Sequence, residues 1–438
     1  MNNRNGPVQS GVPVRRSLEV VRAGLARRRW AEIRFRFYGM ASLAVGLMFL
    51  LIMFSSIIGK AYTAFQQTYV ALDVYFDEQL LDPEGKRDAE TLETADYGGL
   101  VRQSLAALFP EVKERQQKRA LNNLVSSGAA YELRRLLLAQ PDLMGKTQRV
   151  WLPADENVDM FAKGEIDRGG AEEDRRLKDY QLPWLDKLQA EGRLEKRFNT
   201  VFFIAGDSRE PELAGIRGAV VGSFLTLLVT LALSLPIGFA TAVYLEEFAP
   251  SNRWTDMIEV NINNLAAVPS IVFGLLGLAV FINFFGLPRS SPLVGGLVLT
   301  LMTLPVIIIA GRSALKAVPP SIREAALGVG ASHMQTVLHH VFPLAIPGML
   351  TGAIIGMARA LGESAPLLMI GMVAFIVDVP RSVMDPATVL PVQIYLWADS
   401  PERGFVERTS AAILVLLGFL IVMNGLAVYL RKRYEKRW

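Results

Sequence analysis

Six apolar stretches in this 438-residue chain are each long enough to cross a lipid bilayer as a helix, which takes about 20 residues. They cover residues 38–58, 220–245, 258–285, 293–314, 350–377 and 409–430. The third and fifth stretches contain prolines and polar residues, so we expect those two helices to be broken or tilted. The pattern predicts an all-α membrane protein with six transmembrane helices and one long polar region between the first two.

The composition supports this class of protein. Mean hydropathy is +0.29 and 51% of the residues are hydrophobic, which is unusual for a soluble domain because its surface must be polar. The chain has no cysteines, which excludes disulfides and cysteine-ligated metals, and we predict no metal site at its three histidines. The nucleotide-binding pattern GxxxxGK[ST] is also absent, so we expect no cofactor here and ATP hydrolysis, if needed, by another chain.

Charged residues outside the apolar stretches predict the topology. Eight arginines lie between residues 15 and 36, just before the first stretch, and the chain ends in the basic sequence RKRYEKRW. The positive-inside rule therefore places both ends in the cytoplasm, with a basic N-terminus (1–37), an uncleaved first transmembrane helix (38–59) and a basic tail (433–438). The arginines could instead bind nucleic acid or lipid headgroups, but we favour the topological interpretation and predict no nucleic-acid partner.

Residues 60–215 form the long polar region, which this topology places outside the cytoplasm. Segments 68–76 and 197–204 have the β-branched and aromatic content of strands, and 100–108 and 120–138 have helical apolar spacing. We therefore expect a folded α+β domain on the periplasmic side. Its acidic and basic residues are scattered and it has no histidine, so we predict a structural or docking role without catalytic residues.

A cytoplasmic loop at residues 315–345 carries the most informative motif. It begins with Pro319-Pro320-Ser321, and we expect Ser321 to cap a short helix in a capping box with Glu324. Ala325 and Ala326 leave a slim helix face, and Gly330 allows a sharp turn into a second short helix. The sequence predicts a rigid helix–glycine–helix elbow that a soluble partner can grip.

This elbow resembles the "EAA" loop of ABC importer permeases, with Glu324, Ala325, Ala326 and Gly330 in matching places and Pro343 thirteen residues after the glycine. The resemblance implies that these four residues seat in a groove on the ATPase subunit. His340 and Phe342 depart from the family pattern, in which branched apolar residues and leucine are usual at these places.

Three further segments resemble the permease subunits of bacterial phosphate importers of the PstA type. They are YLEEFAP at 244–250, NLAAVPSIVFGL at 264–275 and ARALGESAPLL at 358–368. The resemblance covers about half the chain and implies a MetI-like permease domain at 216–432, preceded by an extended N-terminal region. It implies a location in the bacterial inner membrane and four partners: a second permease (PstC type), an ATPase dimer (PstB type), a periplasmic phosphate-binding protein (PstS type) and phosphate.

Two ionisable residues within the fifth apolar stretch are candidates for the substrate pathway. Arg359 and Glu363 are four residues apart and so share a helix face. Ionisable residues at such depth usually face a bundle interior or a water-filled path, and a guanidinium matches the oxygens of phosphate. The pair could also be purely structural. Arg312, at the end of the fourth stretch, is a second pathway candidate, although we favour a role as a cation at the cytoplasmic edge.

Two other functions remain open from the sequence. A permease of the same fold could carry another oxyanion, such as sulfate or molybdate. A membrane sensor with residues 60–215 as its sensing domain would need a cytoplasmic signalling module, and only a short tail follows the last apolar stretch.

Overall fold

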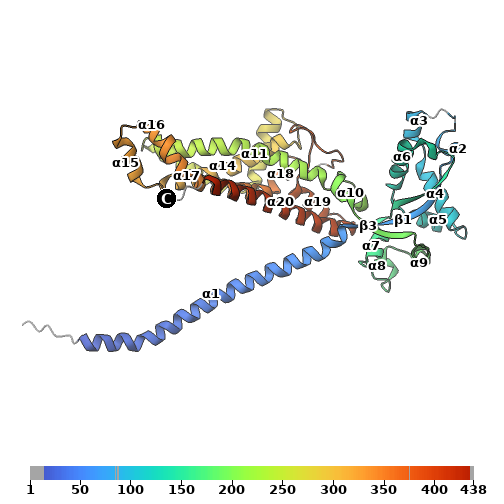
Figure 1. The fold of residues 1–438 in the computed structure, drawn as a ribbon, viewed down its shortest axis with the longest axis horizontal. Helices are drawn as coiled ribbons and strands as arrows, with labels where there is room; N and C mark the ends of the chain where they lie inside the picture. The colour runs from blue at the N-terminus through green and yellow to red at the C-terminus, as the bar shows by residue number, and fades with distance from the viewer. Residues whose placement is uncertain (1–13, 84, 86–87, 374, 435–438) are drawn as a thin grey trace, which may run out of the picture. The chain divides into compact units, whose positions relative to one another are not determined.

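The computed structural model describes residues 14–434 apart from 84, 86–87 and 374 (Figure 1). The chain divides into two compact units, Met1–Ile58 and Gly59–Trp438. Helix α1 (Val14–Ala64) has 51 residues. At 1.5 Å per residue it is about 75 Å long, more than twice the roughly 30 Å of a bilayer's hydrocarbon core. Parts of the predicted basic ends, residues 1–13 and 435–438, lie outside the described residues.

Among the described residues, five helices are long and apolar enough to cross a membrane, and a bent pair makes a sixth if it counts as one span. The five are residues 28–64 of α1; α11 (Arg217–Val243) with the π-helical turn η4 (Tyr244–Phe248); α14 (Pro292–Lys316); α16 (His333–Gln335), η6 (Thr336–Val341) and α17 (Phe342–Gly362) in succession; and α20 (Gly404–Tyr434).

The bent pair corresponds to the third apolar stretch. Helix α12 (Arg253–Ala266) meets α13 (Ser270–Leu276) and its π-helical continuation η5 (Gly277–Phe284) at 105°. Pro269 stands at the break as the N-cap of α13, and proline disfavours helical backbone in the residue before it. The expected break in this stretch is confirmed.

The fifth apolar stretch does not coincide with its helix. The continuous helix covers residues 333–362 instead of the predicted 350–377. It ends because Glu363 has extended backbone angles, and Pro366 lies in the first turn of a separate short helix, α18 (Ala365–Met369). The apolar composition continues past this break, so hydropathy alone misplaces both ends of the helix.

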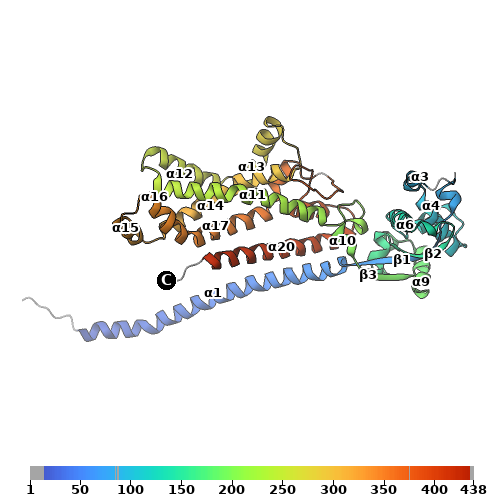
Figure 2. The same ribbon diagram turned by 45° about the horizontal axis from the view of Figure 1, so that its top comes forward.

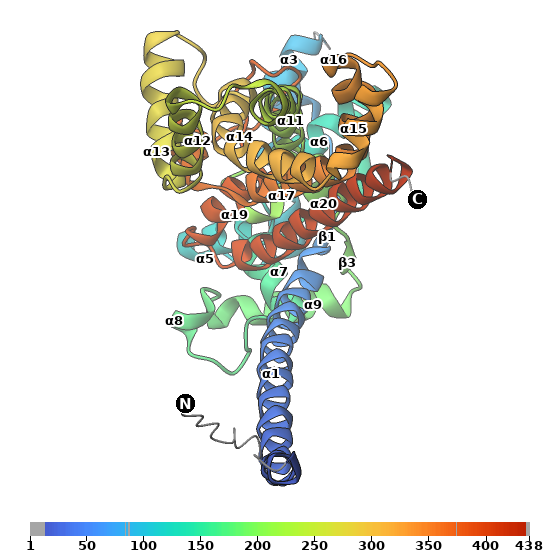
Figure 3. The same ribbon diagram turned by 90° about the vertical axis from the view of Figure 1, so that its left-hand side faces the viewer.

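Helices α11, α14 and α17 pack side by side in the bundle (Figure 2). Helices α14 and α17 approach closely at Gly352, where a Cβ atom would lie only 2.2 Å from the Cβ of Ala310. Only glycine allows this backbone approach, which is typical of helix pairs in membranes. In a nearly end-on view, α12 and α13 lie on one flank of the bundle, and α15 (Pro320–Gly328) and α16 lie on the other (Figure 3).

Residues 66–198 contain a three-stranded antiparallel sheet in the order β2-β1-β3. The strands are β1 (Gln66–Tyr75), β2 (Thr147–Pro153) and β3 (Leu194–Phe198), with Val70 opposite Leu152 and Gln66 opposite Phe198. One face buries Val70, Leu72 and Val74 in a core shared with α4 (Tyr97–Leu108), α6 (Ala129–Ala139) and α9 (Leu182–Ala190). The sheet and the helices α15 and α16 lie at opposite ends of the bundle (Figures 1 and 2).

The local predictions for this region have mixed outcomes. The strand at 68–76 is confirmed, but 197–204 is wrong beyond Phe198, because Asn199 caps the short helix α10 (Thr200–Ile204). Strand β2 was not predicted. The expected helix at 120–138 is two helices, since α5 (Arg115–Asn122) ends well before α6 begins after Gly128.

The remaining short helices connect these parts. They are α2 (Glu78–Leu81), α3 (Ala89–Thr94), η1 (Pro141–Leu143), α7 (Glu156–Lys163), α8 (Glu172–Arg175), η2 (Asp179–Gln181), η3 (Pro211–Leu213) and α19 (Leu390–Ala398).

Candidate functional site: the elbow and its ion pairs

Two adjacent carboxylates at the end of α11 organise the charges near the elbow. Glu246 and Glu247 lie in η4, where the chain leaves the bundle. Glu246 Oε2 accepts a hydrogen bond from Arg312 Nε at 3.2 Å, and Arg312 Nη2 donates to Glu259 of α12 at 2.6 Å. Arg312 therefore bridges η4, at the end of α11, and the middle of α12 from its place on α14, paired with two acidic partners.

The second carboxylate holds the elbow itself. Arg323 in α15 donates from Nη2 to Glu247 Oε1 at 2.6 Å and from Nε to Glu247 Oε2 at 3.3 Å. The same guanidinium donates to the carbonyl oxygens of Val318 and Leu315, at the end of α14. A ring nitrogen of His333 lies 2.8 Å from the carbonyl oxygen of Glu247. The helix before the turn and the helix after it are thus both tied to η4.

The capping box predicted for α15 is wrong. The helix starts at Pro320 with Pro319 as its N-cap, and Ser321 lies inside the first turn without a capping bond. Proline suits the first helical position because its nitrogen has no hydrogen to leave unpaired, so the helix begins one residue before the serine can cap it. A capping box does form at the second helix, between Ser332 and Gln335.

Gly330 makes the predicted turn. Its φ is +88°, a left-handed conformation that favours glycine. The amide of Gly330 donates to Leu327 O at 3.0 Å, and the amide of Ala331 donates to Ala326 O at 3.1 Å. These two bonds form a Schellman motif, which satisfies the last carbonyls of α15 and sets the angle of the elbow.

The elbow residues divide into an exposed and a buried set. Glu324 and Ala325 are exposed, whereas Ala326 is buried within the elbow, which η6 and α15 form together. Apolar side chains are exposed beside Glu324, namely Leu327, Met334, Leu338 and above all Val329, which is 86% exposed. Such a cluster on a protruding turn is typical of a surface that a partner covers.

Arg359 and Glu363 lie at the end of α17 that is far from the elbow. Arg359 Nε is 3.6 Å from Glu363 Oε1, with the arginine side chain 43% exposed, so the two form an ion pair but no hydrogen bond. Glu363 is the C-cap residue and its backbone is extended, so the pair spans the helix end and does not lie along one face. A pair this long and exposed contributes little to stability.

The three pathway candidates do not form one cluster. Arg312 pairs with Glu246 and Glu259, while Arg359 pairs with Glu363. Gly352 of α17 packs opposite Ala310 of α14, and Arg359 is seven residues farther along α17, about 10 Å by helical rise. Arg312 and Arg359 thus lie at different levels of the bundle.

Sequence reasoning missed the residues that hold the elbow in place. Glu247 and Arg323 are separated by 76 residues, and no local spacing rule links them. The available signal was two consecutive glutamates at the end of an apolar stretch, where an unpaired carboxylate would be costly. In the part of the chain that the structure describes, no group of three or more His, Asp or Glu side chains could hold a metal ion.

The chain is similar to known transport proteins. Residues 216–436 match the family described as "Binding-protein-dependent transport system inner membrane component", and residues 22–172 match a domain of unknown function, DUF3333. The probable ABC transporter permease YqgI of Bacillus subtilis is 35% identical over 238 residues, which cover 51% of this chain and 80% of that protein.

Named phosphate permeases are also among the relatives. The phosphate transport system permease protein PstA 1 of Mycobacterium tuberculosis is 32% identical over 217 residues, covering 50% of this chain and 70% of that protein. Among solved structures, the inward-facing MetNI methionine ABC transporter is 19% identical, with a TM-score of 0.39, over 50% of this chain and 96% of that one.

In such transporters a separate subunit hydrolyses ATP, which agrees with the absence of a nucleotide-binding pattern here. The family assignment rests on the sequence match alone. The chain therefore belongs to the binding-protein-dependent transport system inner membrane components, as an ABC transporter permease subunit that resembles the PstA type and carries an N-terminal domain of unknown function.

Proposed function

We propose that this chain is a translocation subunit of an ATP-driven phosphate importer in the bacterial inner membrane. The single observation that carries the substrate class is its likeness to proteins named PstA, at 32% identity over half the chain. Those proteins are named as permeases of phosphate transport systems, and phosphate suits a guanidinium within the bundle.

The arrangement of the elbow and the sheet supports the proposed topology. They lie at opposite ends of the helix bundle, so helices that cross a bilayer would hold them on opposite sides (Figure 1). The arginine-rich N-terminus and basic C-terminus assign the elbow side to the cytoplasm by the positive-inside rule. The sheet region, residues 60–215, then lies in the periplasm.

The elbow is the proposed contact for an ATPase subunit. Glu324 and Ala325 are exposed beside the apolar side chains of Leu327 and Val329, which gives a partner both a charge and a surface to bury. The other expected partners are a homologous second permease, which would complete the pathway, a second ATPase subunit, and a periplasmic phosphate-binding protein that delivers the anion.

Arg359 is the proposed pathway cation. Its ion pair with Glu363 is long and partly exposed, so a phosphate oxygen could replace the carboxylate at small cost. Glu363 would compensate the charge of Arg359 while the path is empty. Arg312 already has two carboxylate partners, and this pairing favours the role of a fixed cation at the cytoplasmic edge.

Uptake of radiolabelled phosphate into proteoliposomes that hold the complete complex tests this function. We expect ATP-dependent uptake that unlabelled phosphate suppresses and that excess sulfate or molybdate does not. Suppression of phosphate uptake by sulfate or molybdate would indicate that the transporter carries that oxyanion instead. A complex that assembles and hydrolyses ATP but moves none of the three anions would contradict the proposal.

A further inference from the structure

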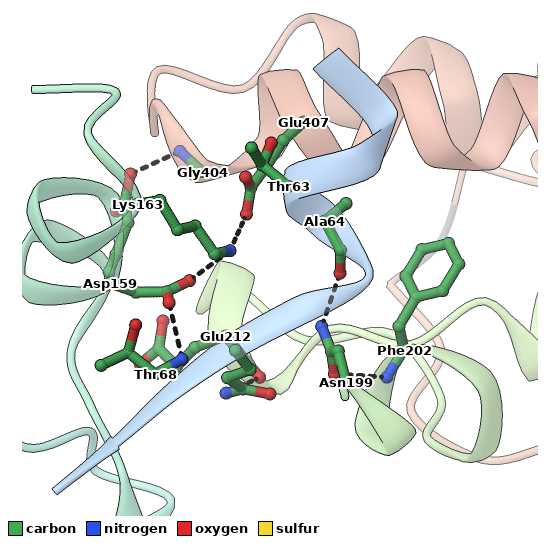
Figure 4. Close-up of polar contacts among 12 residues, drawn as sticks. Thr63, Ala64, Thr68, Asp159, Lys163, Asn199, Phe202, Glu212, Gly404 and Glu407 are labelled. Carbon is green, nitrogen blue, oxygen red and sulfur yellow. Dashed lines mark hydrogen bonds and ion pairs between the residues drawn. The ribbon is translucent and has the colours of Figure 1, made fainter. Parts of the chain in front are cut away.

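The sheet region and the last long helix meet in a buried polar contact, which we call the outer joint (Figure 4). Its members are Glu156, Asp159 and Lys163 of α7, together with Gly404 and Glu407 of α20. The two sides are almost 250 residues apart in the chain, with Lys163 and Glu407 separated by 244 positions.

Lys163 is the centre of the outer joint. Its Nζ lies 2.7 Å from Asp159 Oδ2 and 2.6 Å from Glu407 Oε1, and the three side chains are only 1%, 5% and 6% exposed. Asp159 is fixed in turn, because its Oδ1 accepts a hydrogen bond from the Thr68 amide of β1 at 2.7 Å. A buried cation between two carboxylates keeps its partners together, since separating them would leave charges unpaired in a poorly solvated place.

A second contact fixes the first turn of α20. The amide of Gly404 donates to Glu156 Oε1 at 2.6 Å, so a carboxylate from the sheet region accepts from the start of this long helix. Arg408, the next residue after Glu407, is completely buried with its guanidinium 5.7 Å from the ring centre of Phe202. Arg408 thus adds a second buried cation to Lys163, beside the three carboxyl groups of Glu156, Asp159 and Glu407.

An apolar cluster meets these charges at Phe202, over whose ring the Arg408 guanidinium lies. It contains Ala61 and Ala64 from the end of α1, Phe202 of α10, Trp397 of α19, and Phe405 and Ala411 of α20. The Trp397 ring stacks on Phe405 with ring centres 5.7 Å apart. Asn199 joins the same cluster to the backbone, donating to Ala64 O and accepting from the Phe202 amide.

The number of attachments decides how the sheet region can move. The chain enters it from α1 and leaves it through α10 into α11, and two such connections alone would permit rotation about the line that joins them. The outer joint is a third attachment, on α20, and removes this freedom. Three separate attachments fix the orientation of the sheet region relative to the helix bundle.

We propose that Lys163 is a positioning residue for transport: it fastens the domain of unknown function to the outer end of α20, so that the domain and α20 move together during the transport cycle. This inference rests on the proposed importer function for its transport readout. It gives the domain a mechanical role, in which a partner that binds or pushes the domain displaces α20 directly.

A cross-link at the edge of the joint tests this. Arg176 and Glu402 form an exposed ion pair at 2.7 Å, one on each side of the joint, and losing such a pair costs little. The chain has no cysteines, so Arg176→Cys with Glu402→Cys places the only two thiols in it. Arg168→Cys with Asp186→Cys is the matched control, because that exposed pair lies wholly within the sheet region.

We expect a short bis-maleimide bridge between residues 176 and 402 to leave uptake unchanged, as the control bridge does. Lys163→Met should reduce uptake, and the bridge should restore it, which a merely destabilised protein would not show. Loss of uptake on bridging 176 to 402, with the control bridge harmless, would overturn the proposal because it would mean that the domain must leave α20.

Spin labels at the same two positions separate this proposal from the choice of substrate. The distance between them, measured in the assembled complex without nucleotide and with ATP, should not change. This measurement needs no transported anion, so it holds even if phosphate is the wrong substrate. A nucleotide-dependent shift or broadening of the distance would refute the fixed joint while leaving the importer function intact.

Discussion

Arg323 of α15 and Glu247 of η4 form a doubly hydrogen-bonded ion pair, with nitrogen–oxygen distances of 2.6 and 3.3 Å. The Glu247 side chain is 5% exposed, so water competes weakly for it. The pair connects the elbow to the end of α11, and the same arginine binds carbonyls at the end of α14. Movement of the elbow therefore reaches two long helices through one guanidinium.

Glu247→Gln should uncouple ATP hydrolysis from transport. The change keeps the side-chain shape but removes the charge that holds Arg323, and hydrogen bonds to charged groups are worth about 1.5–3 kcal/mol. We expect uptake per ATP hydrolysed to fall about tenfold while the ATPase still copurifies. Lys316→Gln, which removes an exposed pair at 3.6 Å, is the control and should behave as wild type. Normal coupling in Glu247→Gln would contradict this role.

Arg359→Gln should abolish most phosphate uptake without loss of the complex. The ion pair with Glu363 is too long and exposed to stabilise the fold, so assembly should persist. Losing a charge-assisted contact to the anion should reduce the uptake rate by at least about tenfold. Arg253→Gln, at an exposed arginine at the start of α12, serves as the control. Near-normal uptake by Arg359→Gln would remove this residue from the path.

Val329→Asp should weaken copurification of the ATPase subunit. Val329 is 86% exposed at the tip of the elbow, so the change places a charge where a partner would bury an apolar group, and it leaves the fold of this chain alone. Met384→Asp makes the same kind of change at an exposed residue outside the elbow. Equal copurification of both variants would argue against docking at the tip, and Glu324→Lys offers an independent check on the same surface.

Acidic pH should stabilise the sheet region. Burial raises the pKa of Glu212 and of Glu156 to about 7 from the ordinary 4.5. Because the folded state then binds protons that the unfolded state releases, the free energy of unfolding falls as pH rises from about 4.5 to about 7. Glu212→Gln keeps an acceptor for the Ser126 hydroxyl and should flatten this dependence. Thermal unfolding at about pH 5 and about pH 8 measures it.

The contribution of Asp73 to stability depends on pH in the opposite direction. Hydrogen bonds from Arg149 and Arg193 lower its pKa to about 2 from 3.8. Its contribution to stability is therefore complete above 3.8 and disappears as pH falls toward 2. Asp73→Asn should remove only this low-pH loss, so an Asp73→Asn profile whose slope between about pH 5 and about pH 8 differs from that of the wild type would contradict the assignment.

Gly352→Ala should destabilise the helix bundle. The added Cβ would meet that of Ala310 at 2.2 Å, and forcing extra atoms into a tight contact costs about 1–3 kcal/mol. Gly418→Ala in α20 adds the same methyl group where nothing lies within 4 Å, and it should be neutral or slightly stabilising. Thermal unfolding in detergent compares the two, and equal melting temperatures would mean that α14 and α17 are farther apart than described.

The local features of this fold were predictable, and its long-range contacts were not. The apolar stretches, the break at Pro269 and the turn at Gly330 each follow from a few adjacent residues. The Lys163–Glu407 pair joins positions 244 residues apart, and no periodicity in the sequence indicates that such a contact exists.

Misplaced boundaries have a common physical reason. Hydropathy reports only how apolar a segment is. The predicted fifth helix therefore extended beyond Glu363, although the backbone leaves the helical conformation there. Ser321 was a sound cap by residue type, but Pro320 starts the helix earlier. Both errors arose where backbone geometry overrode side-chain composition, and at α15 a proline at the first helical position is the cause.

At Gly352 only the methyl group of Ala310 separates the backbones of α14 and α17. Two helices packed this closely move as one rigid unit, so a tilt of one tilts the other. Arg312 belongs to α14 and Arg359 to α17, and they lie toward opposite ends of the contact between these two helices. A small rotation at the elbow would therefore displace Arg359, the proposed pathway cation, sideways.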